Sequence, residues 1–236
     1  MTTEIPTQWR ATAIVALDYP DRHAALAMVD RLGDACGFYK VGSELFVADG
    51  HAAIAALRDR GKRIFLDLKF HDIPNTVAGA VASAAGLGVS LLTVHASGGA
   101  RMMQAAVEAA AGRSEVFAVT VLTSLSDAEL GVAWGRLDLQ LDAEVERLAD
   151  LAAAAGVAGV VCSGLEAARL RDRFGRRLQL LVPGVRLAGS AAGDQARVVT
   201  PAQAAAAGAT YVILGRTVTG AASPEKAMAE AVASLE

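Results

Sequence analysis

The sequence predicts an α/β protein with the (β/α)8 TIM-barrel fold, and two observations support this. The first is length, because 236 residues is a common size for a single α/β barrel. The second is a regular alternation of eight short β-prone runs with longer helical patterns, which indicates parallel strands joined by helical crossovers. Eight such pairs fit a closed barrel better than an open, doubly wound sheet, which is the alternative architecture.

The expected elements follow one another along the whole chain. Strands are expected at 11–17, 38–41, 63–68, 90–94, 116–122, 159–162, 178–182 and 210–214. Helices are expected at 21–32, 44–60, 74–87, 99–111, 142–155, 165–174, 201–207 and 224–236. No shift of composition and no Ser/Pro-rich linker divides the chain, so we expect one domain over residues 1–236.

Composition argues against several classes of protein. The 53% hydrophobic content is interrupted by polar or charged residues before any run reaches membrane-spanning length. Residues 1–10 lack the basic segment and apolar core of a signal peptide. We therefore expect a soluble, cytoplasmic protein with no membrane partner. A net charge of −3 without a basic run argues against a nucleic-acid partner.

The cysteines and histidines give no sign of a metal site. Cys36 and Cys162 form neither a disulfide framework nor a metal-binding spacing, and reduced thiols are the simpler interpretation. No HExxH motif is present, so we expect no metal. Cys162 ends the sixth expected strand, where a packed thiol is favoured over a nucleophile. His95 follows the fourth strand, where a hydrogen-bonded structural histidine is favoured over a catalyst.

The most informative stretch is 64–76, where an apolar β-prone run ends in alternating charges and a proline then starts a helix. Because strand side chains alternate between faces, Asp67 and Lys69 point to the same side near the end of the strand. A carboxylate and an ammonium on an otherwise apolar strand are costly unless they are paired or used in chemistry. This pair is therefore the first candidate for a functional site.

Charged and polar residues also follow the other expected strands. They are Asp18 after the first strand, Lys40 on the second, Asp72 after the third, and Thr123 and Ser124 after the fifth. In a barrel, the catalytic groups lie at the C-terminal ends of the strands. Charges of alternating sign on the first three strands favour a functional site over a set of solvated loop residues.

A glycine and an arginine follow both the seventh and the eighth strand, in Pro183-Gly184-Val185-Arg186 and in Gly215-Arg216. The loops after these two strands commonly bind phosphate in barrels. Glycine lets the backbone approach the ligand, and arginine offers two parallel donors to the phosphate oxygens. This pairing predicts a phosphorylated ligand, and the alternative is two surface arginines near turns.

Two connections are long, at 123–141 and 183–200. The second is rich in glycine and alanine, a composition that suits a loop able to open and close over a ligand. A plain surface loop explains the same composition, and the sequence favours neither interpretation.

These residues carry a resemblance to the orotidine 5′-phosphate decarboxylase family. The run at 67–76, Asp-Leu-Lys-Phe-His-Asp-Ile-Pro-Asn-Thr, resembles the signature of that family. Further matching segments lie at 17–18, 40–42, 93–98, 122–124, 183–186, 193–195 and 215–216. The resemblance implies a (β/α)8 barrel, decarboxylation of orotidine 5′-phosphate to UMP without metal or cofactor, and a homodimer whose subunits share active sites. Thr217 departs from the proline of many bacterial relatives, and we expect this to affect the start of a helix rather than function.

The resemblance also assigns roles to individual residues. The implied catalytic residues are Lys69, Asp67, Asp72 and Lys40, with Lys69 stabilising and protonating the C6 carbanion. The implied substrate-binding residues are Asp18, Lys40, Ile73, Thr76, Thr123, Ser124, Pro183, Arg186, Gln195, Gly215 and Arg216. Asp72, Ile73 and Thr76 are implied to reach the site of the partner subunit.

Two other functions stay open. One is that of a related sugar-phosphate decarboxylase, which shares the Asp-x-Lys-x-x-Asp pattern on its strand but uses a divalent metal. The other is a non-catalytic, nucleotide-binding barrel, which the complete set of charged residues disfavours. An assay of orotidine 5′-phosphate turnover, with and without a chelator, separates all three functions.

Overall fold

The strands of the protein form a closed parallel barrel. The computed structural model describes residues 11–136, 138–187 and 197–235. The strands are β1 (Thr12–Ala16), β2 (Phe38–Gly42), β3 (Arg63–Phe70), β4 (Leu91–His95), β5 (Glu115–Val119), β6 (Gly159–Val161), β7 (Gln179–Val182) and β8 (Tyr211–Leu214). Each strand pairs with the next one in sequence, and β8 pairs with β1. The predicted barrel is confirmed, and the open sheet is wrong.

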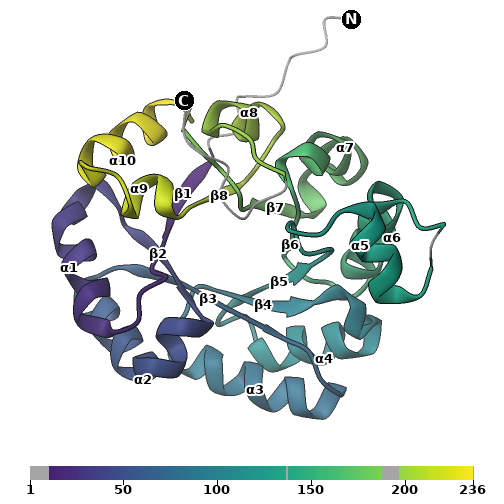
Figure 1. Ribbon diagram of the computed structural model, residues 1–236. Helices are drawn as coiled ribbons and strands as arrows, with labels where there is room; N and C mark the ends of the chain where they lie inside the picture. The colour runs from purple at the N-terminus through teal and green to yellow at the C-terminus, as the bar shows by residue number, and fades with distance from the viewer. Residues whose placement is uncertain (1–10, 137, 188–196, 236) are drawn as a thin grey trace, which may run out of the picture.

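The helices form a ring around the outside of the barrel, as Figure 1 shows. They are α1 (Arg22–Leu32), α2 (Ser43–Asp59), α3 (Pro74–Gly86), α4 (Ala100–Ala110), α5 (Asp127–Trp134), α6 (Leu141–Ala154), α7 (Gly164–Phe174), α8 (Pro201–Ala206), α9 (Arg216–Thr219) and α10 (Pro224–Ala233). In the described part of the chain, none of the helices is long and apolar enough to cross a membrane.

The largest differences between the structure and the sequence prediction lie at two helices and two strand ends. Helix α5 lies inside the connection that carries no predicted element, and the short α9 follows β8 directly. Helix α5 has a capping box, in which Ser126 and Glu129 each bond the other's backbone N–H; this Ser-x-x-Glu spacing was a readable signal for a helix start. Strand β3 continues to Phe70, whereas β5 ends at Val119, before the predicted end.

The inside of the barrel is filled by large side chains. Phe38, Phe117 and Tyr211 belong to one buried cluster, with Tyr211 packing edge-on against both phenylalanines at ring-centre distances of 5.9 Å. Gly159 in β6 makes room for this packing, because a Cβ atom there would lie 2.4 Å from the ring of Phe117. A second, larger cluster lies between the strands and the helices. These two layers of packing hold the C-terminal ends of the strands in fixed relative positions.

Candidate active site

A cavity of about 470 Å³ lies at the C-terminal ends of the strands. Its lining includes the predicted residues Asp18, Lys40, Asp67, Lys69, Thr123, Ser124, Pro183, Arg186, Gly215 and Arg216. These residues come from β2 and β3 and from the segments that follow β1, β5, β7 and β8. The fold therefore brings together side chains that lie up to about 200 residues apart, as the barrel architecture predicts.

Four charged side chains of alternating sign form a continuous row in this cavity. The Nζ of Lys40 lies 2.8 Å from the Oδ1 of Asp18 and 4.0 Å from the Oδ2 of Asp67. The same Oδ2 of Asp67 lies 2.8 Å from the Nζ of Lys69. Asp67 thus sits between two ammonium groups and forms an ion pair with each of them, which holds both lysine side chains in place.

Exposure changes along this row of charges. The side chains of Lys40 and Asp67 are only 11% and 14% exposed, whereas that of Lys69 is 36% exposed. The two inner charges lie in surroundings where electrostatic interactions are stronger than in water. Of these three side chains, Lys69 is the most exposed and can contact a ligand in the cavity.

Lys69 has an unusual backbone conformation. Its φ is +52°, which is left-handed and uncommon for a residue with a Cβ atom. The pairing of β3 with β4 changes register in the same place, between Leu66 and Phe70. Strain of this kind costs on the order of 1–3 kcal/mol and is concentrated at functional sites. The regular alternation that predicted a shared side for Asp67 and Lys69 is therefore interrupted at Lys69, although both residues line the cavity.

Thr93 on β4 stabilises this conformation. Its Oγ1 accepts a hydrogen bond of 2.9 Å from the backbone N–H of Lys69 and donates one of 2.9 Å to the Oδ1 of Asp67. Thr93 is fully buried. One hydroxyl therefore fixes both the backbone of the lysine and the orientation of the carboxylate beside it.

Two arginines also line the cavity. Arg186 follows β7, and Arg216 is the first residue of α9. Burial lowers the pKa of Arg186, and the positive charge of Arg216 lowers it further. Two guanidinium groups that repel each other form a region that favours an anion. The hydroxyl of Thr217 donates to the carbonyl of Val185 at 3.2 Å, which ties the start of α9 to the segment that carries Arg186.

His95 and Cys162 do not line the cavity. The ring of His95 packs 5.4 Å from that of His71. Burial lowers the pKa of His95, the nearby His71 and Lys69 lower it further, and Asp67 opposes them. Burial raises the pKa of the Cys162 thiol to about 12. A protonated, fully buried thiol is a weak nucleophile, so the structure favours a packed Cys162 over a reactive one.

The chain matches one protein family over nearly all of its length. The family model described as orotidine 5′-phosphate decarboxylase / HUMPS matches residues 12–231. The chain belongs to this family. The matched range of this chain includes every residue that lines the cavity.

Individual members of the family are similar in sequence and in structure. The orotidine 5′-phosphate decarboxylase of Alkalilimnicola ehrlichii is 54% identical over 222 residues, which cover 92% of this chain and 92% of that relative. The enzyme of the same name from Alcanivorax borkumensis is 51% identical, covering 89% and 92% of the two chains. The crystal structure of orotidine 5′-phosphate decarboxylase from Lactobacillus acidophilus superimposes with a TM-score of 0.85 at 35% identity, covering 96% and 99%.

Four of the residues implied by the family resemblance do not join the described cavity. Asp72, Ile73 and Thr76 are exposed at the start of α3 and are absent from the lining. Ile73 is 66% exposed to solvent. The carboxylate of Asp72 accepts a hydrogen bond of 2.6 Å from the backbone N–H of Ile73. Gln195 lies outside the described residues, as does most of the glycine-rich part of the 183–200 connection.

Thr93 and Thr217 contribute to the site, although the sequence prediction gave neither of them a role in it. Thr93 lies in the segment 93–98, which carries the family resemblance, but the resemblance assigned it no role. Thr217 was expected to affect a helix start alone, yet its hydroxyl also connects the two arginine-bearing segments. A polar residue inside an otherwise apolar strand was the one signal for Thr93, because a buried hydroxyl requires a partner.

We expect Thr93→Val to lower kcat about 10- to 100-fold for the family reaction. The valine keeps the shape of the side chain but leaves the Lys69 N–H and an oxygen of Asp67 without this partner. Each loss is worth about 1–3 kcal/mol, and a tenfold change of rate is about 1.4 kcal/mol. Steady-state kinetics together with thermal unfolding would measure this.

Thr120→Val is the matched control for this prediction. Thr120 is also buried, and its hydroxyl donates to the carbonyl of Val161 at 2.9 Å, but it contacts neither Lys69 nor Asp67. We expect the control variant to lose stability of similar size and to keep most of its kcat. Equal losses of kcat in the two variants would contradict the role given to Thr93.

Proposed function

We propose that the chain decarboxylates orotidine 5′-phosphate to UMP, the last step of de novo pyrimidine biosynthesis, without a metal or cofactor. The observation that carries this proposal is a single cavity lined both by the row of charges from Asp18 to Lys69 and by Arg186 and Arg216. The names of the relatives that are 51% and 54% identical support it.

The reaction needs a fixed positive charge at the carbon that loses CO₂. Breaking the bond leaves an electron pair in the plane of the pyrimidine ring, where the π system cannot delocalise it. The Nζ of Lys69 supplies the charge that stabilises this carbanion and then the proton that converts it to UMP. The hydrogen bond between Lys69 and Asp67 holds the ammonium in place before the substrate arrives, so that little reorganisation is needed during the reaction.

Asp67 has a second, smaller effect in this proposal. Its carboxylate lies beside the departing carboxylate of the substrate, and two like charges ~4 Å apart repel by roughly 4 kcal/mol at an effective dielectric constant near 20. Enzymes lower barriers by about 8–23 kcal/mol. In this proposal, stabilisation of the carbanion by Lys69 therefore lowers the barrier more than repulsion by Asp67 does.

The remaining lining residues bind the rest of the substrate. Asp18 and Lys40 contact the ribose hydroxyls, and Thr123 and Ser124 border the pyrimidine. The family resemblance also assigns substrate binding to Gln195, which lies outside the described residues. Pro183, Arg186, Gly215 and Arg216 surround the phosphate. Because the phosphate is distant from the reacting carbon, its binding energy acts indirectly, by holding the pyrimidine in the reactive position.

We also propose a homodimer in which each subunit completes the site of the other. Asp72, Ile73 and Thr76 are exposed and lie outside the cavity of their own barrel, as expected of residues that reach into a partner's site. An exposed isoleucine next to a charged residue suits an interface that buries both. The catalytic unit in this proposal is a single domain per subunit. A cytoplasmic location is supported by the two unpaired, buried cysteines.

Mixing two inactive variants tests the shared sites. Lys69→Ala and Asp72→Ala are each expected to abolish activity. After subunit exchange, a mixed dimer contains one site with both residues intact, so about a quarter of all sites should regain activity in an equal mixture. Failure of the mixture to regain activity, when mass analysis shows that subunits have exchanged, would contradict the sharing of sites.

The competing function is that of a metal-dependent sugar-phosphate decarboxylase. The family description includes a second group beside the decarboxylases, so the family match alone does not separate them. In the described part of the chain, no group of three or more His, Cys, Asp or Glu side chains is placed to hold a metal ion.

The test of the proposed function follows the absorbance of orotidine 5′-phosphate with and without a chelator. We expect turnover that the chelator leaves unchanged. Turnover that the chelator abolishes would favour the metal-dependent reaction. Binding of UMP without any turnover of orotidine 5′-phosphate would instead identify a nucleotide-binding barrel.

A further inference from the structure

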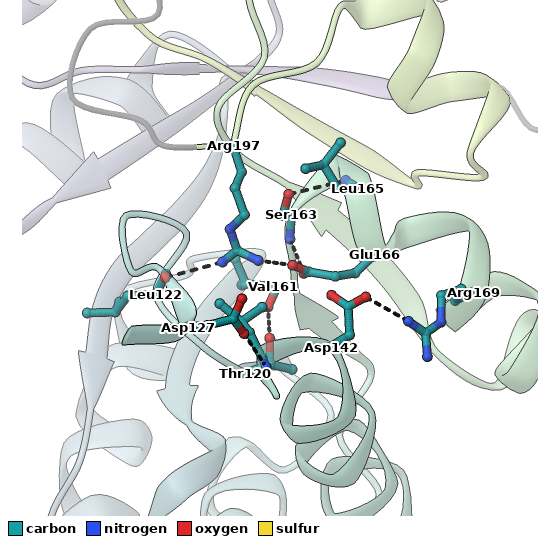
Figure 2. Close-up of polar contacts among 11 residues, drawn as sticks. Thr120, Leu122, Asp127, Asp142, Val161, Ser163, Leu165, Glu166, Arg169 and Arg197 are labelled. Atoms are coloured by element: carbon teal, nitrogen blue, oxygen red, sulfur yellow. Dashed lines mark hydrogen bonds and ion pairs between the residues drawn. The ribbon is translucent and has the colours of Figure 1, made fainter. Parts of the chain in front are cut away.

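Arg197 connects two sides of the cavity although it does not line it. Its side chain is 13% exposed and points between the segment that follows β5 and the start of α7, as Figure 2 shows. The described contacts of its guanidinium are with Leu122 on one side and with Glu166 on the other. These contacts join parts of the chain that lie 75 and 31 residues away in the sequence.

The contact with Leu122 stabilises the turn that presents two substrate-binding candidates. The Nη2 of Arg197 donates to the carbonyl of Leu122 at 3.3 Å. The same carbonyl accepts a hydrogen bond of 3.0 Å from the backbone N–H of Leu125, which closes a four-residue turn. Thr123 and Ser124 are the two central residues of this turn, and both line the cavity. Arg197 therefore holds the turn from outside.

Glu166 fixes the position of the Arg197 side chain. Its carboxylate is 5% exposed and is ion-paired through Oε1 with the Nη1 of Arg197. Its Oε2 accepts a hydrogen bond of 2.8 Å from the backbone N–H of Ser163, in the capping box at the start of α7. A buried ion pair contributes little net stability, because desolvation offsets the attraction. This pair fixes the direction of the guanidinium relative to a rigid helix.

The backbone that follows Arg197 reaches the phosphate side of the cavity. The carbonyl of Val199 accepts a hydrogen bond of 2.9 Å from the N–H of Arg186, and the N–H of Val199 donates to the carbonyl of Gly184 at 3.4 Å. The side chain of Val199 packs on Gly164, where a Cβ atom would lie 2.4 Å from the Cγ2 of Val199. The short segment 197–199 therefore links the Thr123-Ser124 turn to the arginine-bearing segment after β7.

We infer that Arg197 is a positioning residue, which acts through the Leu122 carbonyl to hold the Thr123-Ser124 turn in place relative to Arg186. The inference rests on the proposed function, in which the turn borders the pyrimidine and Arg186 contacts the phosphate. A substrate that joins a pyrimidine to a phosphate needs both contacts at a set separation. Arg197 and Glu166 maintain that separation without touching the substrate.

The test uses the double variant R197M/E166Q in the full-length protein. Removing the arginine alone would leave Glu166 as an unpaired buried charge and could prevent folding. The glutamine removes this charge and keeps an oxygen to accept the Ser163 N–H. The matched control is R169M on α7, because Arg169 also forms ion pairs with Asp142 and Glu146, but its side chain is 55% exposed.

Hydrogen exchange measures the positioning directly and needs no substrate. We expect the Leu125 amide of R197M/E166Q to exchange about tenfold faster, because the turn has lost a charge-assisted hydrogen bond. Amides of α1 should be unchanged, and R169M should match the parent protein throughout. An unchanged exchange rate at Leu125 in a folded R197M/E166Q protein would overturn the inference, whether or not the parent protein turns over orotidine 5′-phosphate.

A double-mutant cycle with Ser124→Ala measures the consequence for catalysis. R197M/E166Q should lower kcat/KM for orotidine 5′-phosphate about tenfold in the parent protein and much less when Ser124 is already alanine. A merely structural role would lower kcat/KM by the same factor in both backgrounds, and that result would overturn the inference. Because the parent protein's own turnover tests the proposed function, failure of the function and failure of the inference are distinguishable.

Discussion

Replacing Lys69 by alanine is expected to abolish turnover of orotidine 5′-phosphate while leaving the affinity for UMP within a few fold. In the proposed function, this variant loses both the proton donor and the charge that stabilises the carbanion. A general acid contributes about 10²–10⁴-fold and a preorganised charge about 10²–10³-fold, so kcat should fall by at least about four orders of magnitude. UMP has no carbanion, so its binding depends less on the charge of Lys69.

The measurement combines single-turnover kinetics with a binding titration of UMP. Lys226→Ala is the control, because Lys226 is exposed on α10 and does not line the cavity. We expect the control variant to keep the parent kcat. Residual kcat in Lys69→Ala within about tenfold of the parent value would contradict the assigned role, since a general acid alone contributes more than this.

Arg216→Ala is expected to lower kcat/KM for orotidine 5′-phosphate about 10- to 100-fold. A hydrogen bond to a charged group is worth about 1.5–3 kcal/mol, and each 1.4 kcal/mol is a factor of about ten. Arg186 also lines the cavity and is unchanged in this variant, so we expect part of the positive charge at the phosphate to be retained. The loss should be confined to substrates that carry the phosphate.

Orotidine, which lacks the phosphate, distinguishes this role from a general loss of activity. We expect kcat/KM for orotidine to be nearly the same in Arg216→Ala and in the parent protein. Arg113→Ala serves as the control, because Arg113 is exposed in the connection before β5 and lies away from the cavity. Equal losses with orotidine and with orotidine 5′-phosphate would contradict a role of Arg216 at the phosphate.

Local pattern was sufficient to predict the barrel and most of its elements. Each of the eight expected strands has a counterpart in the structure, because short apolar runs separated by helix-length segments indicate parallel strands. Helix α5 was missed because its apolar pattern is weak, although the Ser126-x-x-Glu129 spacing signalled its start. Helix α9 has only four residues, too few for a recognisable period.

The sequence by itself also determined which strand ends carry the charged residues. Asp18, Lys40, Asp67 and Lys69 follow from strand alternation and from the rule that parallel strands end at one face of a barrel. The two glycine-arginine pairs follow from the same rule. These are local properties of each strand and of the residues next to it, so they need no knowledge of partners elsewhere in the chain.

Only the tertiary structure decided how these side chains are held. Thr93 forms hydrogen bonds with Lys69 and Asp67, which lie 24 and 26 residues away in the sequence. Arg197 forms a hydrogen bond with the carbonyl of Leu122, 75 residues away. The positive φ of Lys69 interrupts a pattern that otherwise alternates regularly. Hydrogen bonds between distant segments leave no periodic signal in the sequence, because their geometry exists only once the barrel has closed.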